Sequence, residues 1–120
     1  MRTTRSLIFN LRLFRQCLLL GFLLTPVMAV GQVPDFEETL RAADQGEARA
    51  QLNLGVMYAN GEGVPEDYVR AYAWLNIAAA SGGEDAIELR SMTRELMTPS
   101  QIAEAQQLSR EIFERIQGNQ

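Results

Sequence analysis

The sequence contains no histidine and no lysine, and Cys17 is its one cysteine. Without histidine, the chain cannot build a serine–histidine or cysteine–histidine nucleophile, or an imidazole metal site. Without lysine, it cannot form a Schiff base with a substrate. Carboxylates are therefore the only side chains left for general acid and base catalysis. We expect a protein that is not an enzyme and that holds no metal and no cofactor.

Acidic residues are also absent from the first sixteen positions, which carry four arginines. The apolar run Cys17–Leu24 follows, and small residues lead up to Ala29. This order is typical of a signal peptide, so we expect residues 1–29 to be cleaved off after Ala29, with Gly31 as the alternative. A membrane anchor is disfavoured because the apolar run is far shorter than the roughly 20 residues of a spanning helix. The sequence thus predicts a periplasmic or secreted protein with no stable membrane span after cleavage.

Disulfides and a basic surface are both missing from the predicted mature domain, residues 30–120. It has no cysteine, so packing alone has to hold it together, although exported domains of this size often depend on disulfides. It carries 7 arginines and 15 acidic residues, which gives a net charge of −8. Since nucleic acids are bound through basic faces, we expect no nucleic-acid partner.

Strand-like alternation is missing as well, and the apolar residues of this region recur at helical spacing. Asp35 with Glu38 predicts a capping box at the first helix, and Thr98 with Gln101 predicts one at the last. Gly55 lies inside a helix, where glycine costs about 1 kcal/mol against alanine, so we expect a neighbouring helix to approach it closely. The fold class is therefore all-α, a short stack of antiparallel helical hairpins. Its five helices are expected at residues 35–46, 47–59, 67–81, 84–97 and 98–117.

Two parts of this region repeat each other at a displacement of 36 residues. Such a period is typical of helical repeat proteins. A helix end, a glycine stop and the start of the next helix are repeated together. The four matching small residues are Ala42, Ala43, Gly46 and Ala50, which recur as Ala78, Ala79, Gly82 and Ala86.

The stretch AQLNLGVMYANGEGVPEDYVRAYAWLNIAAASG closely resembles a Sel-one-like repeat (SLR), a relative of the tetratricopeptide repeat (TPR). Thirteen positions carry the resemblance, in order, over little more than thirty residues. On the first helix and in the turn they are Ala50, Leu54, Gly55, Tyr58, Gly61, Gly63 and Val64. On the second helix they are Asp67, Ala71, Trp74, Ala78, Ala79 and Gly82.

The resemblance implies one complete repeat at about 44–82, preceded by a half repeat at 35–46 and followed by capping helices at 84–117. It also implies protein–protein interaction as the general activity, and the small size suggests an accessory or adaptor protein. A single repeat cannot form a long concave superhelix. Because the mature region has no cysteine, enzyme-like roles of cysteine-rich relatives do not carry over.

Acidic residues gather in the loop of the repeat and at the start of the following helix: Glu62, Glu66, Asp67, Glu84 and Asp85. Their spacing matches no calcium-binding loop, and GEGVPE matches no phosphate-binding fingerprint. Acids are common at helix N-termini because they cap the helix and interact with its dipole, so we interpret them as structural. A small hydrolase that uses a carboxylate pair is the alternative function.

Trp74 and Tyr58 share helix faces with Leu54 and Ala78, so we expect both aromatic side chains in the core. The expected partner is another protein, and the candidate residues for binding it lie beside this stripe. Of these, Tyr68, Tyr72 and Asn76 are expected to be exposed on the second helix. A self-associating structural protein is a third alternative, because the apolar edges of the terminal helices could dock between copies. The candidate binding residues are Asn53, Met57, Asn60, Tyr68, Tyr72 and Asn76.

Overall fold

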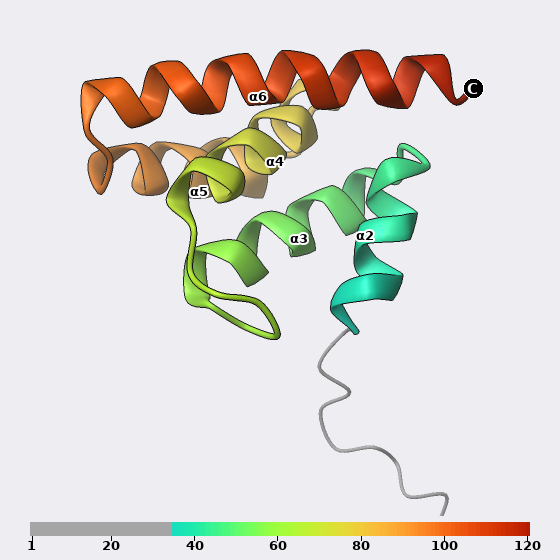
Figure 1. The fold of residues 1–120 in the computed structure, drawn as a ribbon, viewed down its shortest axis with the longest axis horizontal. Helices are drawn as coiled ribbons and strands as arrows, with labels where there is room; N and C mark the ends of the chain where they lie inside the picture. Colours follow the sequence, from blue (N-terminus) through green and yellow to red (C-terminus); the bar gives the residue numbers. More distant parts are fainter. Residues whose placement is uncertain (1–34) are drawn as a thin grey trace, which may run out of the picture. The chain divides into compact units, whose positions relative to one another are not determined.

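The computed structural model describes residues 35–120, so the predicted signal peptide and its cleavage site lie outside the described residues. These residues form five helices and no strand, which confirms the all-α prediction (Figure 1). Within the same range, no helix has the length and the apolar character that crossing a bilayer requires. The helices are α2 (Phe36–Asp44), α3 (Ala48–Asn60), α4 (Tyr68–Ala80), α5 (Glu84–Glu95) and α6 (Pro99–Gly118).

Two of the five helices, α4 and α6, begin with a side-chain cap. The Thr98 hydroxyl accepts from the Gln101 N–H at 3.2 Å, and the Gln101 side chain accepts from the Thr98 N–H at 2.9 Å, so the capping box of α6 is confirmed. The capping box predicted for α2 is wrong, because the Asp35 side chain accepts no bond there. Asp35 is exposed, so water competes with the backbone N–H groups for its carboxylate. The Asp35 carbonyl accepts from the N–H and the hydroxyl of Thr39, both at 2.9 Å.

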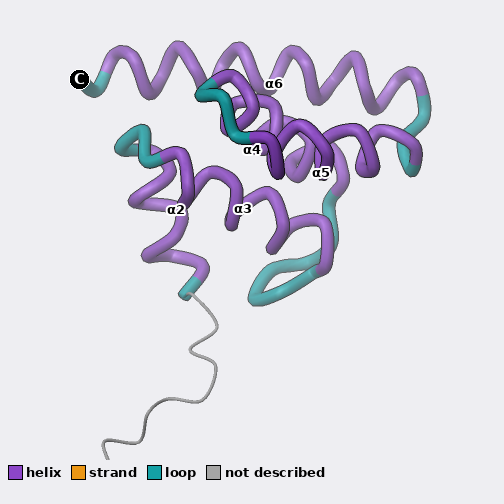
Figure 2. Tube along the Cα trace, turned by 180° about the vertical axis from the view of Figure 1, so that it is seen from behind, coloured by secondary structure: helices purple, strands orange, loops and turns teal. Residues whose placement is uncertain are grey.

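The turn between α3 and α4 depends on two glycines in the left-handed region. Gly61 has φ of 69° and Gly63 has φ of 70°, conformations that residues with a Cβ rarely adopt. The Asp67 N–H then donates to the Tyr58 carbonyl at 2.9 Å and closes the loop onto α3. The loop is therefore the corner of a helical hairpin, which returns the chain antiparallel to α3 (Figure 2).

Close contact between α3 and α4 is centred on Gly55. A Cβ at Gly55 would lie 2.6 Å from Cγ of Leu75 and 3.3 Å from the Ala71 carbonyl oxygen. Leu75 is fully buried and has no room to move aside. The close approach predicted from a glycine inside the helix is thus confirmed.

The last helix packs along α4 and also reaches α2, so segments from the two ends of the domain lie side by side (Figures 1 and 2). The apolar face of α6 is buried at Ala105, Ile112 and Ile116. A chain of hydrogen bonds fixes its position, because the Arg90 guanidinium donates to Asn76 at 2.8 Å and Asn76 donates to Ser109 at 2.9 Å. These hydrogen bonds join α5, α4 and α6 between residues that are far apart in the sequence, so no local sequence pattern predicts them.

Tyr58 and Trp74 are both buried, as the sequence predicts. The Tyr58 ring meets Phe36 edge to face, with centroids 5.6 Å apart, and the Arg70 guanidinium lies 6.0 Å from its centroid. Burial raises the pKa of Tyr58 above its ordinary value of 10.0, the positive charge of Arg70 lowers it, and the negative charges of Asp67 and Glu37 raise it. The folded state therefore holds the neutral phenol more strongly than the unfolded chain does.

Replacing Gly55 by alanine tests the close approach of the two helices. Alanine favours helix formation, but its Cβ would collide with the buried Leu75, and such overpacking usually costs about 1–3 kcal/mol. We expect Gly55→Ala to lower the free energy of unfolding by that amount in urea titrations followed by circular dichroism. Gly118→Ala is the control, because nothing lies within 4 Å of a Cβ there and stability should not fall. If Gly55→Ala left the stability unchanged, α3 and α4 could move apart enough to hold the extra methyl group at no cost, which would contradict the prediction.

The raised pKa of Tyr58 predicts a loss of stability at alkaline pH. Its contribution is complete below pH 10.0, where both states carry the neutral phenol, and it is lost as the pH rises through the folded-state pKa. In Tyr58→Phe, which has no phenol at this position, the fall in unfolding free energy above pH 10 should be smaller than in the parent protein. Tyr68→Phe should keep the part of the fall that Tyr58 causes, although it removes a second phenol whose pKa is raised, by Glu66. Equal pH profiles for Tyr58→Phe and the parent would contradict the prediction.

Candidate functional site

The acidic residues of the loop are engaged in local structure. Both oxygens of Asp67 interact with Arg70, one accepting from its backbone N–H at 2.9 Å and one from its guanidinium at 2.6 Å. Glu62 accepts from the Asn60 amide at 3.1 Å. The charge of Glu66 raises the pKa of the neighbouring Tyr68. Asp67 is therefore a helix cap, as its place in the sequence predicts.

The two acids after the second glycine pair, Glu84 and Asp85, lie in the first turn of α5. This is the position at which negative charge interacts favourably with the helix dipole. Within residues 35–120, no group of three or more histidine, cysteine, aspartate or glutamate side chains is placed to hold a metal ion.

The candidate binding residues do not all lie at the surface. Met57 and Tyr72 are buried, so the expectation that Tyr72 is exposed is wrong, and Met57 offers almost no surface to a partner. Tyr72 is buried because α3, α5 and α6 all pack on α4 and cover more of it than one apolar stripe. Met57 lies under the loop, with its Cε 3.6 Å from the position of a Cβ on Gly63.

The other four candidates have mixed surroundings. Asn76 is half-buried and committed to the hydrogen bonds with Arg90 and Ser109. Asn53 and Tyr68 are half-buried, and Asn60 is exposed in the loop. None of the six residues lines the two hollows described next.

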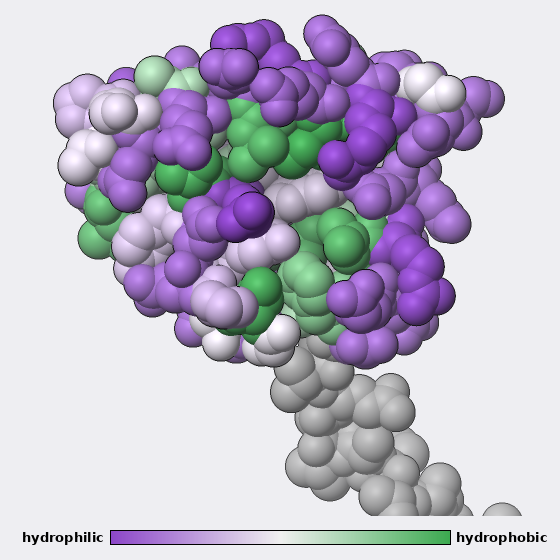
Figure 3. Space-filling model, viewed as in Figure 1, coloured by the Kyte–Doolittle hydropathy of each residue, from purple (hydrophilic) through white to green (hydrophobic). Residues whose placement is uncertain are grey.

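One hollow lies where α2, α4 and α6 meet, with Tyr58 of α3 at its side, and has a volume of about 260 Å³. Its floor is apolar and its rim is charged. We name it the Trp74 hollow. Figure 3 shows hydrophobic side chains gathered in the middle of the molecular face below α6, with hydrophilic side chains around them. The lining residues are Leu40, Asp44, Tyr58, Arg70, Trp74, Leu108, Ile112 and Arg115.

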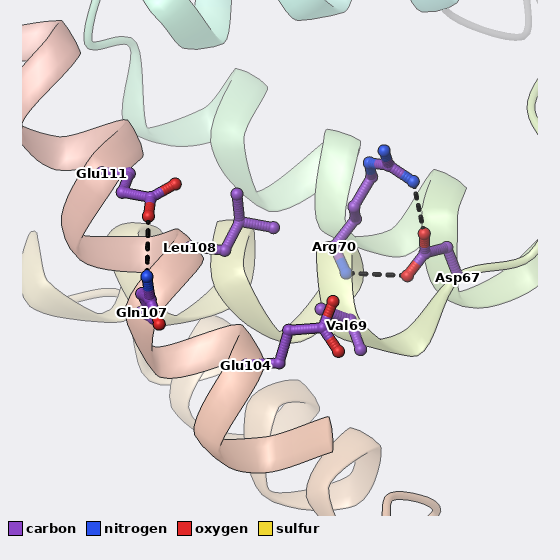
Figure 4. A pocket seen from close by; sticks show the side chains of 7 residues that line it. All are labelled: Asp67, Val69, Arg70, Glu104, Gln107, Leu108 and Glu111. Atoms are coloured by element: carbon purple, nitrogen blue, oxygen red, sulfur yellow. Dashed lines mark hydrogen bonds and ion pairs between the residues drawn. The ribbon is translucent and has the colours of Figure 1, made fainter. Parts of the chain in front are cut away.

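A second hollow adjoins the first and shares Arg70 and Leu108 with it. It has a volume of about 380 Å³ and lies between the start of α4 and the middle of α6. We name it the Glu104 hollow. Figure 4 shows Leu108 of α6 pointing towards Arg70 of α4, with Glu104 and Glu111 on either side of it along α6. The lining residues are Asp67, Val69, Arg70, Glu104, Gln107, Leu108 and Glu111.

Two ion pairs hold the rim of these hollows. Arg115 donates to Asp44 at 2.6 Å and so joins α6 to α2, and Arg70 pairs with Asp67 at 2.6 Å. Each arginine side chain remains more than half exposed, so each pair adds little to stability on its own. Their effect is to fix the positions of two arginines beside an apolar floor.

Sequence reasoning missed this site because α6 supplies one of its walls. The apolar stripe of Leu108, Ile112 and Ile116 predicts that one face of α6 is buried, but it does not tell which helices that face covers. Asp44 and Arg115 are 71 positions apart, and no local signal links them. Trp74 was recognised as core, and it also lines the hollow.

A larger hollow of about 490 Å³ lies among the start of α3, the end of α4 and the start of α5. It is lined by small and charged residues, including Gly82, Gly83 and Arg49, and by no aromatic side chain. The Trp74 hollow, with an apolar floor and two aromatic residues, is the better candidate for recognition.

Known proteins similar to this chain share its repeat and its fold. The model of the Sel1 repeat family matches residues 48–83, which comprise α3, the glycine turn and α4, and this range overlaps the repeat predicted at 44–82. No curated protein matches the sequence.

A similar solved structure is that of a protective antigen present in uropathogenic Escherichia coli strains, which displays an SLR fold. The two chains are 34% identical, with a TM-score of 0.65 over 68% of this chain. The matched part is only 18% of that antigen's length, so this chain corresponds to a small part of the larger repeat protein. The family match and this likeness together identify the chain as an SLR-family repeat protein.

Proposed function

We propose that the chain is an exported accessory or adaptor protein that binds another protein through the Trp74 hollow and catalyses no reaction. Sel1 repeats generally mediate protein interactions, and their helical fold is typically non-catalytic. The observation that carries the proposal is the apolar floor of Trp74, Leu108 and Ile112 beside two positioned arginines. Arginine is among the residues that most often dominate protein interfaces, and both arginine side chains are more than half exposed here.

The size of the Trp74 hollow favours a protein over a small molecule. Pockets for small molecules usually enclose roughly 300–1,000 Å³ and bury most of the ligand. The Trp74 hollow, with about 260 Å³, fits one side chain of a partner, and the adjoining hollow extends the contact along α6. Two shallow hollows side by side suit a segment of polypeptide that lies across them.

The loop acids support a role without catalysis. A carboxylate pair for hydrolysis needs one group free to take up and release a proton. Both oxygens of Asp67 are held by Arg70 at the start of α4. Asp67 therefore contributes to the helix cap and to the rim of the Glu104 hollow, and no observation favours the hydrolase alternative.

Export is proposed from the order of the first 29 residues, and it predicts a processed protein. Expressed in Escherichia coli with its own leader, the chain should be released by osmotic shock and should begin after Ala29 or after Gly31. Intact-mass spectrometry measures the cut. Tryptophan at both Val27 and Ala29 should block processing, because the peptidase needs small residues there. A mature protein that keeps Met1 would contradict export by this route.

Partner binding through the Trp74 hollow predicts a loss of binding in Leu108→Gln. Leu108 is half-buried and shared by both hollows, so a polar side chain there removes apolar contact from the centre of the face. Affinity capture with tagged protein from the envelope of its own cell, quantified by mass spectrometry, should show the partner depleted at least about ten-fold, the effect of about 1.4 kcal/mol. Val69→Gln, which alters only the Glu104 hollow, should give a smaller loss.

Phe113→Gln is the matched control for this experiment. Phe113 is 48% exposed on the same helix but lines neither hollow, so the variant should retain the partner. Helicity measured by circular dichroism shows that each variant is folded. Retention of the partner by a folded Leu108→Gln would refute the proposed site. Light scattering distinguishes a partner from a second copy of the chain.

A further inference from the structure

The charges around the two hollows are unevenly compensated. Arg70 and Arg115 each hold a carboxylate at 2.6 Å. Within the described part of the chain, neither Glu104 nor Glu111 forms an ion pair with an arginine, and Glu111 accepts only an uncharged bond from Gln107 at 3.1 Å. The rim thus presents two neutralised cations and two uncompensated anions.

The two anions lie along one side of α6, with Leu108 between them (Figure 4). A helix rises about 1.5 Å per residue, so along the axis Glu104 is about 6 Å from Leu108, and Glu111 is about 4.5 Å beyond it. An extended peptide advances about 3.3 Å per residue. Cationic side chains within about three residues of an apolar anchor would therefore reach both carboxylates while the anchor contacts Leu108 and the hollow.

The net charge of the whole domain has the same sign as the two uncompensated glutamates. Residues 35–120 contain all 15 acidic residues of the chain and 7 arginines, so the domain carries a net charge of −8. A domain of this charge attracts basic segments and repels acidic ones over the range of the Debye length, about 10 Å at 0.1 M salt.

We infer that the two hollows bind a partner segment in which an apolar side chain is flanked by arginine or lysine. The apolar side chain enters the Trp74 hollow, and the cations meet Glu104 and Glu111. This inference rests on the proposed function, since it names the chemistry of the partner at the same site. An acidic segment is disfavoured because it would have to displace Asp44 or Asp67 from its arginine and lie beside the uncompensated glutamates.

Selection from a library of random twelve-residue peptides, made without tryptophan, tests the inference on the purified protein as it is recovered from cells. The selected peptides are titrated against the fluorescence of Trp74, which is the one tryptophan of the chain and lines the hollow. We expect the selected sequences to share an apolar residue with arginine or lysine within three positions. We also expect binding to weaken as the salt concentration rises.

The double variant Glu104→Gln with Glu111→Gln should weaken these peptides about five- to ten-fold at 50 mM salt, the sum expected for two exposed charge pairs. At 500 mM salt the difference should shrink to less than about two-fold. The matched control is Glu95→Gln with Glu114→Gln, which removes the same charge from exposed positions outside both hollows and should have a much smaller effect.

The outcomes separate this inference from the proposed function. Selected peptides without cations, or an equal effect of the two double variants, would overturn the inference. If Leu108→Gln still abolished the binding of those peptides, the proposed site would stand with a partner of different chemistry. If no peptide were selected, or if the selected peptides bound Leu108→Gln normally, neither the inference nor the binding of a peptide segment at this site would hold.

Discussion

The contact between Gly55 and Leu75 is the constraint on which the rest of the domain depends. A missing Cβ lets the backbones of α3 and α4 approach until Leu75 lies against Gly55, with Ala71 beside it. Leu54 of α3 and Leu75 of α4 are the largest fully buried side chains of the described residues. Helix α4 is central, because α5 and α6 pack on the sides that α3 leaves open, and those sides carry apolar residues. A domain without cysteine in this region thus obtains its stability from one closely packed helix pair and the two helices laid on it.

The position of α6 creates the recessed surface that we propose for binding. Instead of continuing a regular stack, α6 lies along α4 and reaches α2, where Arg115 pairs with Asp44. The space left among the three helices is the Trp74 hollow. A single repeat cannot offer the long concave face of a repeat array, and this crossing helix supplies a small recessed face in its place.

Local features of the fold were predictable from the sequence because they depend on residues close together in the chain. The glycine turn, the Thr98 capping box and the close approach at Gly55 have signatures within about five residues, and the structure contains all of them. The capping box at Asp35 was wrong, because a matching residue pair does not ensure that an exposed carboxylate bonds the backbone rather than water.

The candidate site was predictable only in part, since it depends on contacts distant in sequence. Trp74 and Tyr58 were identified as core residues, but Tyr72 was expected to be exposed, and Met57 was expected to belong to a binding face. Periodicity gives the most apolar side of a helix, whereas the exposed fraction depends on how many neighbours pack on it, and α4 has three. The role of Arg115 depends on its pairing with a residue 71 positions away. No pattern within α6 indicates that pairing.

Stability and recognition share residues in a domain this small. Trp74 is 3% exposed, so nearly all of its surface is already buried in the free protein, and a partner can cover little more of it. The floor of the Trp74 hollow therefore supplies shape. The binding free energy has to come from half-exposed groups, such as Leu108 at its edge and Val69 in the adjoining Glu104 hollow, and from the charges along α6. Core substitutions test the fold, whereas the rim of α6 can vary without loss of the hairpin. Variation in partner choice among proteins with this domain is consequently expected along α6, and the Gly55–Leu75 contact is expected to stay constant.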